Sequence, residues 1–222
     1  MRAHHEHEFE AAPGLPEALP VGEHIIWQGS PDVHALASHV YHMRQLAPYF
    51  AAMVALQGLL IAGEPQGFAF RPLLISCLLA FLALGLLYAV AVFTVRNTLY
   101  TLTNKRVVMR VGIVLTITLN LPYRQIATAS VVQFGNGFGD IALDLGGDDR
   151  IGWLHLWPHA RPWVINKPQP SLRCLADVKQ VAEILQAAWC AANPGVMVRL
   201  GDIPNVCATG TAALSKHGSI TT

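Results

Sequence analysis

Charge is scarce in this sequence. Only 13% of the residues are charged, well below the roughly 25% of ordinary soluble domains. The formal net charge of +1 argues against a bulk electrostatic partner such as nucleic acid. The four cysteines are scattered without metal-binding spacing, which favours free thiols in a reducing compartment. The first 20 residues are acidic and rich in proline, so we expect no signal peptide there.

Residue patterns typical of catalytic or metal sites are also missing. His155 and His159 lie close together, but no serine or cysteine has a sequence context that would pair with them. The glycine-rich run 135–139 lies between predicted strands, which favours a bulged turn over a phosphate-binding loop. Calcium-ligand spacing of the EF-hand kind is absent from the nearby aspartates, Asp140, Asp144, Asp148 and Asp149. We therefore predict that the protein is not an enzyme and has no metal site or cofactor.

Two long apolar runs, residues 46–62 and 72–95, dominate the chain. The only charges between them, Glu64 and Arg71, lie in their short connector. A bilayer core about 30 Å thick requires about 20 apolar residues in a helix. The second run is long enough, and the first becomes so if the segment from His42 adds a turn. Two buried helices of a soluble protein are disfavoured, because a chain of 222 residues has too little mass to cover them. The sequence thus predicts a transmembrane helical hairpin.

Basic residues are unevenly distributed around this hairpin. Arg44 flanks the first apolar run, and Arg96, Lys105, Arg106 and Arg110 follow the second, whereas the connector has one arginine that Glu64 offsets. The positive-inside rule therefore places both termini in the cytoplasm. The four residues that follow are also a candidate site for the membrane surface or lipid headgroups. Determination of the topology alone explains them equally well.

Small residues in the second run offer a surface for helix packing. Ser76, Gly85 and Ala89 permit close approach of another transmembrane helix. Small residues are, however, common in membrane spans. His39 and His42 precede the hairpin on one face of a predicted helix, where they could bind a metal or a pigment, but a polar membrane interface is the favoured interpretation.

After the hairpin the apolar pattern alternates with a period of two residues. It predicts seven short strands at residues 97–103, 106–111, 113–121, 126–134, 140–145, 151–157 and 162–166. A capping box formed by Asp177 and Gln180 then opens an amphipathic helix. The apolar stripe of this helix consists of Val178, Val181, Ala182, Leu185, Ala188 and Trp189. Seven antiparallel strands and one closing helix are the order of a pleckstrin-homology-like (PH-like) barrel.

The predicted fold is therefore that of an α+β membrane protein. The hairpin is followed by a seven-stranded antiparallel PH-like β-barrel, which a C-terminal helix caps. The predicted segments are a disordered N-terminal tail (1–20), a juxtamembrane strand and helix (21–45), the transmembrane hairpin (46–95), the cytoplasmic PH-like domain (96–192) and a flexible C-terminal tail (193–222).

Several strings in the chain resemble known families. Residues 100–108 (YTLTNKRVV) and 22–29 (GEHIIWQG) are similar to segments of bacterial pleckstrin-homology proteins. Residues 110–122 (RVGIVLTITLNLP) and 147–163 (GDDRIGWLHLWPHARPW) resemble the PuhB family of photosynthetic reaction-centre assembly proteins of purple bacteria. The resemblance covers about residues 20–192. It implies a non-enzymatic role in assembling the reaction centre and core light-harvesting complex in the cytoplasmic or intracytoplasmic membrane, and it transfers no catalytic residue.

The aromatic segment around residues 154–163 is the predicted partner surface. Its candidate residues are Trp153, His155, Trp157, His159, Arg161 and Trp163, with the histidines and the arginine at the rim. Reaction-centre subunits, core antenna subunits and membrane lipids are the expected partners, and a homo-oligomer is left open. The alternative function is a membrane-tethered PH-like domain that senses lipid or scaffolds proteins unrelated to photosynthesis. A pigment carrier using His39 or His42 is a weaker third hypothesis.

Overall fold

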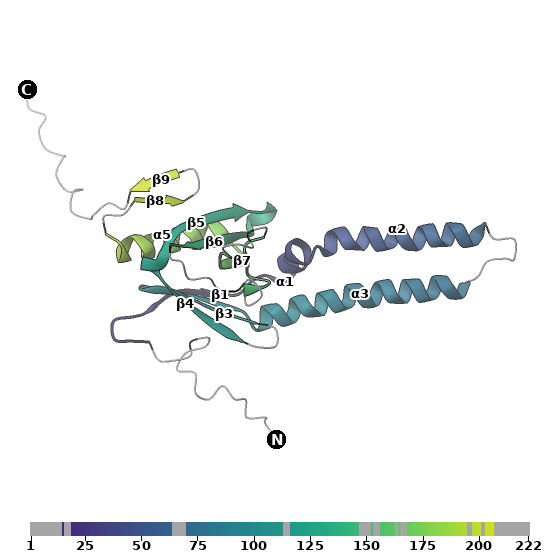
Figure 1. The fold of residues 1–222 in the computed structure, drawn as a ribbon, viewed down its shortest axis with the longest axis horizontal. Helices are drawn as coiled ribbons and strands as arrows, with labels where there is room; N and C mark the ends of the chain where they lie inside the picture. The colour runs from purple at the N-terminus through teal and green to yellow at the C-terminus, as the bar shows by residue number, and fades with distance from the viewer. Residues whose placement is uncertain are drawn as a thin grey trace, which may run out of the picture.

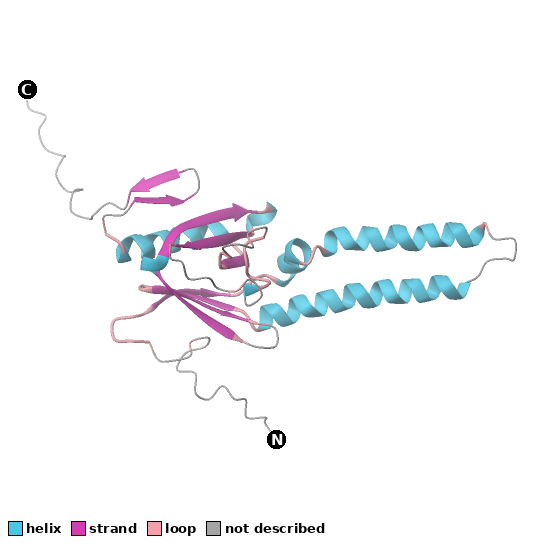
Figure 2. Cartoon of the chain, in the orientation of Figure 1, coloured by secondary structure: helices cyan, strands magenta, loops and turns pink. Residues whose placement is uncertain are grey.

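The chain consists of a long helical hairpin and a β-rich domain at one end of it (Figure 1). Figure 2 shows the same division by secondary structure, with two long helices projecting from the strands. The fold is α+β, as predicted. The computed structural model describes residues 15, 19–63, 70–112, 116–146, 152, 156–162, 164, 168–194, 197–200 and 203–206.

The hairpin is formed by α2 (Met43–Ala62) and α3 (Phe70–Arg96). Both helices, of 20 and 27 residues, are long and apolar enough to cross a membrane. No residue of α2 is buried, and α3 buries only Ala91 and Thr94 near its end. The alternative of two buried core helices is therefore wrong. The start of α2 at Met43 supplies the extra turn that the first apolar run required.

The first sheet contains four antiparallel strands in the order β1-β2-β3-β4. β2 (Leu99–Thr103) and β3 (Arg106–Val111) form the hairpin that the sequence predicted, and β4 (Ile117–Pro122) pairs with β3. β1 (Ile25–Gly29) completes the sheet at its other edge. Alternate residues of β2 and β3 belong to the main core, because every second residue of a strand faces the same side: Tyr100, Leu102, Val107, Met109 and Val111.

The helical hairpin is an insertion in this sheet. β1 lies before α2 in the sequence, yet it pairs antiparallel with β2, so that Gly29 is opposite Tyr100. Our prediction assigned β1 to a separate juxtamembrane segment, residues 21–45, and began the domain at residue 96. The strand pairing shows that this division is wrong. The domain is built from residues on both sides of the hairpin.

The second sheet begins with three antiparallel strands. They are β5 (Ile126–Gln133), β6 (Gly139–Leu145) and β7 (Ser171–Leu175), with β6 in the middle. No pairing joins this sheet to the first among the described residues. The predicted closed barrel is therefore wrong, and the domain consists of two separate sheets.

Two further strands extend the second sheet at β5. β8 (Met197–Leu200) contacts β5 in parallel at Ala129, and β9 (Ile203–Val206) pairs antiparallel with β8. Both lie within residues 193–222, for which the sequence predicted no regular structure. That prediction relied on the absence of a clear apolar period, which is weak for strands of four residues.

The sequence placed its last two strands too early. In the described part of residues 151–166 the chain forms turns and one isolated bridge, between Ala160 and Pro170. The strand that pairs with β6 at the edge of the second sheet is β7 instead. The alternating Leu and Trp around residues 153–157 matches the pattern of a half-buried strand, which led to the wrong prediction there. β7 was not predicted because it contains the charged Arg173, although all five of its residues are buried.

The glycine-rich run 135–139 connects β5 and β6, as predicted for a tight turn. A short 3₁₀ turn, η3 (Gly135–Gly137), lies between the strands, and the Phe134 N–H donates to the Phe138 carbonyl at 2.7 Å. Gly137 has φ +83°, which is strained for other residues. A Cβ atom at Gly139 would lie 2.4 Å from the Val132 carbonyl oxygen, so close approach of the two strands requires glycine.

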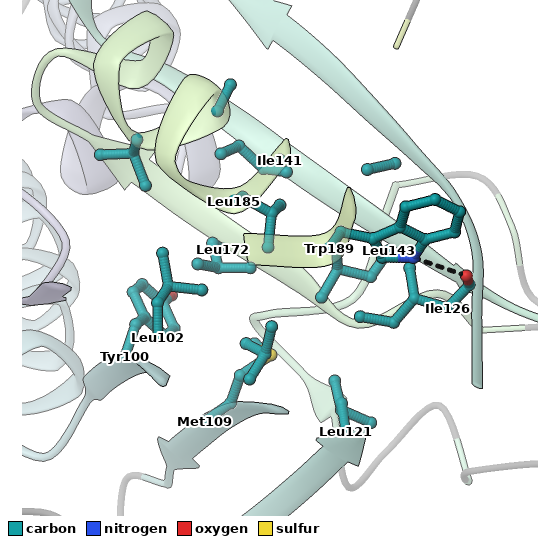
Figure 3. Close-up of a cluster of buried hydrophobic side chains, with 14 of the residues drawn as sticks. Tyr100, Leu102, Met109, Leu121, Ile126, Ile141, Leu143, Leu172, Leu185 and Trp189 are labelled. Carbon is teal, nitrogen blue, oxygen red and sulfur yellow. Dashed lines mark hydrogen bonds between the residues drawn. The ribbon is translucent and has the colours of Figure 1, made fainter. Parts of the chain in front are cut away.

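The core lies between the two sheets and α5 (Val178–Ala192) (Figure 3). All six predicted apolar positions of α5 are buried: Val178, Val181, Ala182, Leu185, Ala188 and Trp189. The Trp189 indole N–H donates to the Ile126 carbonyl at 3.0 Å, which fixes the end of the helix on β5. The predicted capping box is wrong, because Asp177 has a left-handed backbone and makes no side-chain cap. Burial of each large apolar side chain contributes roughly 1.5–3 kcal/mol, so packing holds α5 in place.

The cysteines are not all free. Cys77 in α3 and Cys174 in β7 are free thiols, whereas Cys190 in α5 is disulfide-bonded. The prediction of four free thiols is therefore wrong for Cys190. Sequence spacing does not reveal which thiols the fold brings together.

Candidate functional site at the junction of hairpin and domain

Two short connections join the helical hairpin to the first sheet. α3 ends at Arg96 and β2 begins at Leu99, so two residues form the whole link on that side. On the other side, α1 (Val33–Ala35) and a π-helical turn, η1 (Leu36–Val40), lie between β1 and α2. The ends of both helices are therefore held close to the sheets.

α1 and η1 pack between the end of α3 and the second sheet. The Asp32 carboxylate accepts the N–H of Ala35 at 2.8 Å, and the Asp32 N–H donates to the Cys174 carbonyl in β7 at 2.9 Å. A small buried cluster fills the remaining space: Ala35, Leu36, Ala37, Tyr41, Ala91 and Cys174. This second cluster fastens the hairpin to the domain independently of the main core.

The two histidines of this connection do not meet. The His39 ring stacks on Phe134, with 4.4 Å between the ring centroids. His42 is exposed and has a left-handed backbone (φ 55°) immediately before α2. The predicted shared face is wrong, because the chain turns at His42 instead of continuing one helix. Within the described residues, no group of three or more histidine, cysteine, aspartate or glutamate residues could hold a metal ion.

A chain of buried hydrogen bonds runs from the end of α3 into the second sheet. The Thr98 hydroxyl donates to the Thr94 carbonyl at 2.7 Å, and its oxygen lies 3.1 Å from Nε2 of His159. Nδ1 of His159 lies 2.7 Å from the Tyr100 hydroxyl, and that hydroxyl accepts the backbone N–H of Arg173 at 3.1 Å. Side chains from the α3–β2 link, β2 and the loop before β7 therefore share one network with backbone groups of α3 and β7.

The directions of these bonds fix the protonation state of His159. The Thr98 hydroxyl hydrogen is used on Thr94, so the Thr98 oxygen accepts from Nε2–H. Nδ1 must then accept from the Tyr100 hydroxyl. Burial, and to a lesser extent the Arg173 cation, lower the pKa of His159 to about 3. Burial raises the pKa of Tyr100. The network is neutral at physiological pH, and a fully buried imidazole cannot reach a substrate.

A buried ion pair continues the network. Nε of Arg173 lies 2.6 Å from Oδ2 of Asp140, and the other Asp140 oxygen accepts the N–H of Cys174 at 2.7 Å. The Arg173 guanidinium also donates to the carbonyls of Ala160 and Pro158, at 3.2 and 3.4 Å. Burial raises the pKa of Asp140, and the neighbouring Arg173 cation opposes that rise. Arg173 thus holds the loop of residues 156–162 against β6 and β7.

The predicted partner surface is only partly exposed. Trp153, His155 and Trp163 lie outside the described residues. Trp157 is 44% exposed. Arg161 is half-buried and donates to the Gln169 side chain at 2.9 Å.

The placement of His159 at the rim of that surface is wrong. Its side chain is fully buried, because Thr98 and Tyr100 satisfy both ring nitrogens inside the junction. A polar residue in a proline-rich loop is usually exposed, and only the tertiary structure supplies these partners. His159 therefore cannot contact a partner directly.

Sequence reasoning missed Thr98, Tyr100, Asp140 and Arg173 as members of this site. The available signals were weak. Tyr100 occupies an inward position of β2 together with Leu102, which indicates a buried phenol that needs a partner. Arg173 is flanked by apolar residues in the run SLRCL, which indicates a charge inside a buried strand. Neither signal names the partner, because the contacts cross long stretches of sequence.

The four basic residues of the predicted membrane-surface site are divided between two ends of the domain. Arg110 is opposite Leu99, beside the end of α3, and Arg96 is the exposed last residue of α3. Lys105 and Arg106 lie at the turn of the β2–β3 hairpin, one full strand away from the helices. A strand of five residues is about 16 Å long at 3.3 Å per residue.

Lys105 and Arg106 therefore lie apart from Arg96 and Arg110, and the structure does not bring the four predicted residues together in one site. Arg106 instead forms an ion pair with Glu23, with 2.7 Å between Nε and Oε1. Glu23 also accepts the Thr103 hydroxyl at 2.8 Å, so this pair fastens the segment before β1 to the far end of the sheet.

The three predicted helix-packing residues do not form one surface. Ser76 lines an apolar groove of about 590 Å³ between α2 and α3, together with Gln57, Ala80 and Ala83. Gly85 is exposed, and a Cβ atom there would meet nothing within 4 Å. Ala89 is half-buried. Ser76 thus faces the hairpin's own groove, whereas Gly85 offers an outward surface.

Comparisons with known proteins agree with the domain described above. The family of bacterial PH domains matches residues 49–189. A protein of Rhodobacter capsulatus, named "Uncharacterized 23.7 kDa protein in puhA 5'region", is 36% identical over 187 residues, which cover 83% of this chain and 87% of that protein. A crystal structure of a protein with a pleckstrin-homology domain from Shewanella loihica is 15% identical and covers 41% of this chain and 71% of its own, but its TM-score of 0.28 does not establish a shared fold. The family match, which covers more than half of the chain, shows that this chain belongs to the bacterial PH domain family.

Proposed function

We propose that this protein is a non-enzymatic assembly factor for the photosynthetic reaction centre and core light-harvesting complex. The observation that carries the proposal is the relative of 36% identity, whose name places it in the puhA 5′ region. The strings at residues 110–122 and 147–163 support it, because they resemble the PuhB family, whose name shares the puh designation. The buried, neutral His159 gives the site structural rather than catalytic chemistry.

The proposed mechanism uses two surfaces. In the membrane, the outward faces of α2 and α3 contact the transmembrane helices of incoming subunits, and Gly85 allows close approach. At the membrane surface, the domain contacts the cytoplasmic parts of the same subunits. The short connections at the junction fix the position of the domain relative to the two helices. One incoming subunit can therefore be bound both by its transmembrane helices and by its cytoplasmic part. Such a factor lowers the ordering cost of assembly without forming or breaking bonds.

The proposed location is the cytoplasmic or intracytoplasmic membrane of a bacterium, with two spans and both termini in the cytoplasm. Pairing of β1 with β2 supports this topology, because the strands before and after the hairpin must lie on one side of any membrane that it crosses. Arg44 and Arg96 at the domain-side ends of the helices agree with the positive-inside rule.

Topology is tested by reporter fusions in the native membrane. Fusions at Gln66 and at the C-terminus should report opposite sides, because α2 and α3 each cross once. A fusion after Pro20 is the matched control and should report the same side as the C-terminus. Activity of the Gln66 fusion on the same side as the other two would rule out the hairpin topology.

The assembly function is tested by an in-frame deletion. Assembled reaction centre and core antenna should fall in amount, while bacteriochlorophyll synthesis continues, because no chemical step is lost. Absorbance spectra of intact membranes and quantitative native gels measure the complexes, and the full-length gene supplied in trans is the control. Normal complex levels in the deletion strain would overturn the proposal.

The second candidate function is a membrane-tethered PH-like protein that senses lipid or scaffolds proteins unrelated to photosynthesis. The match to the bacterial PH domain family favours it, because that description carries no photosynthetic role. The same deletion separates the two functions. Changes in envelope proteins or lipids, with unchanged photosynthetic complexes, would support this second candidate.

A further inference from the structure

The exposed indole of Trp157 lies at the level where both long helices end. Its ring is in edge-to-face contact with Tyr41, with 6.1 Å between the ring centroids. Tyr41 precedes the first residue of α2, Met43, by two positions, and its hydroxyl lies 2.9 Å from that of Thr94 in the last turn of α3. The Thr94 hydroxyl donates to the Val90 carbonyl, so Tyr41 is the donor to Thr94. Trp157 is thereby placed beside both helix ends.

The exposure of Trp157 is unusual in the domain. Outside α2 and α3, the exposed large hydrophobic side chains of the described residues are Val21, Ile25, Ile26, Val132 and Trp157. Trp157 is the aromatic one, at 44% exposure, and it covers Tyr41, which is 8% exposed. An indole combines a large apolar face with one N–H donor, the combination that is enriched where a bilayer meets water.

Buried contacts on the inner side of the domain hold the loop that contains Trp157. His159, two residues later, is fully buried between Thr98 and Tyr100. The Arg173 guanidinium donates to the carbonyl oxygens on both sides of His159, those of Pro158 and Ala160. The position of Trp157 is therefore set by buried contacts of its neighbours, and its outward face needs little further ordering to bind.

The dimensions of the hairpin place this indole at a lipid interface. A helix of 20 residues such as α2 is about 30 Å long, the thickness of a bilayer's hydrocarbon core. Its first residues then lie at the boundary on the domain side, and Tyr41 and Trp157 lie there too. Arg44 in the first turn of α2 and Arg96 at the end of α3 are both exposed on the domain side of the hairpin and suit the phosphate groups of lipids.

We propose that Trp157 inserts into the headgroup region of the membrane and fixes the height of the domain above the bilayer. This inference rests on the proposed membrane placement of the hairpin. It makes lipid the binding partner of Trp157, which the sequence analysis predicts to be part of a protein-binding surface. Lipid is favoured because the indole lies beside the ends of both helices, where a bilayer around the hairpin would reach it.

The test is tryptophan fluorescence of the full-length protein in phosphatidylcholine–phosphatidylglycerol vesicles. Trp27, Trp153, Trp163 and Trp189 also emit, so the signal of Trp157 is the difference between the wild type and Trp157→Phe. We expect a blue-shifted difference spectrum that lipid brominated near the headgroup quenches more strongly than lipid brominated near the chain end. A matched control, Ile26→Trp with Trp157→Phe, places the indole at the far end of β1, where aqueous iodide should quench it and brominated lipid should not.

Flotation of the same vesicles keeps the two proposals separate. If the protein floats but the difference signal of Trp157 is quenched by iodide and not by brominated lipid, the hairpin is inserted and the inference about Trp157 is overturned. That outcome leaves Trp157 available to a protein partner. If the protein does not float with vesicles, the membrane placement itself is wrong.

Discussion

Replacing Arg173 with methionine should lower the free energy of unfolding by about 3–5 kcal/mol, the range for removing one member of a buried ion pair. The variant leaves the Asp140 carboxylate buried without its cation, while it still accepts the Cys174 N–H. It also removes two hydrogen bonds to the loop of residues 156–162. Thermal unfolding in detergent, followed by near-ultraviolet circular dichroism, should show a Tm lower by roughly 2–4 °C per kcal/mol.

Two further variants make this prediction specific. Arg161→Met is the matched control, because Arg161 is half-buried and donates to a neutral amide; it should cost about 1 kcal/mol or less. The double variant Arg173→Met with Asp140→Asn should be more stable than Arg173→Met alone. An asparagine still accepts the Cys174 N–H but carries no charge. Equal losses for Arg173→Met and Arg161→Met, or no recovery in the double variant, would show that the ion pair does not hold the junction.

The stability of the domain should also fall as the pH is lowered, because His159 must stay neutral. The pKa of His159 is about 3 in the folded protein, against an ordinary value of 6.5. Its contribution is fully present above pH 6.5 and is lost as the pH falls toward 3. Within that interval the free energy of unfolding should fall steadily, by on the order of 1 kcal/mol per pH unit. Denaturant titrations in detergent between pH 7 and pH 4 measure the slope.

Glutamine is the informative replacement for His159. An amide can donate to Thr98 and accept from the Tyr100 hydroxyl, as the imidazole does, but it does not titrate. His159→Gln should therefore keep most of the stability at pH 7 and lose this part of the pH dependence. His159→Phe leaves the Tyr100 hydroxyl without an acceptor on this side and should cost about 1–3 kcal/mol at every pH. If the wild type and His159→Gln show parallel pH profiles, the neutral, buried histidine is not what sets acid stability.

Local patterns predicted the elements whose signals are local. The six apolar positions of α5 repeat at helical spacing, and all are buried. The runs that became α2 and α3 have almost no charge, which few structures other than membrane spans tolerate. β2 and β3 are joined by a turn of two residues, so their pairing is also local. In each case one stretch of sequence contains the whole physical reason for the structure.

The contacts that define the junction are not local. Gly29 is paired with Tyr100 across the entire hairpin, and no periodicity within either strand records this pairing. His159 has the sequence surroundings of an exposed loop residue, and its burial depends on Thr98 and Tyr100 in other elements. Buried polar residues resemble surface residues until their partners are known. For this reason the sequence predicted His159 at the exposed rim of its loop, whereas the fold buries it.

The position of the hairpin between β1 and β2 determines an order of events during synthesis. β1 is made first, but its partner strand emerges only after both long helices have been translated. On the proposed topology, the edge of the first sheet stays unpaired until both helices have entered the bilayer and the chain has returned. On that topology, completion of the first sheet follows insertion of the two helices. Until β1 and β2 pair, the first sheet has an open strand edge, a surface prone to aggregation during folding.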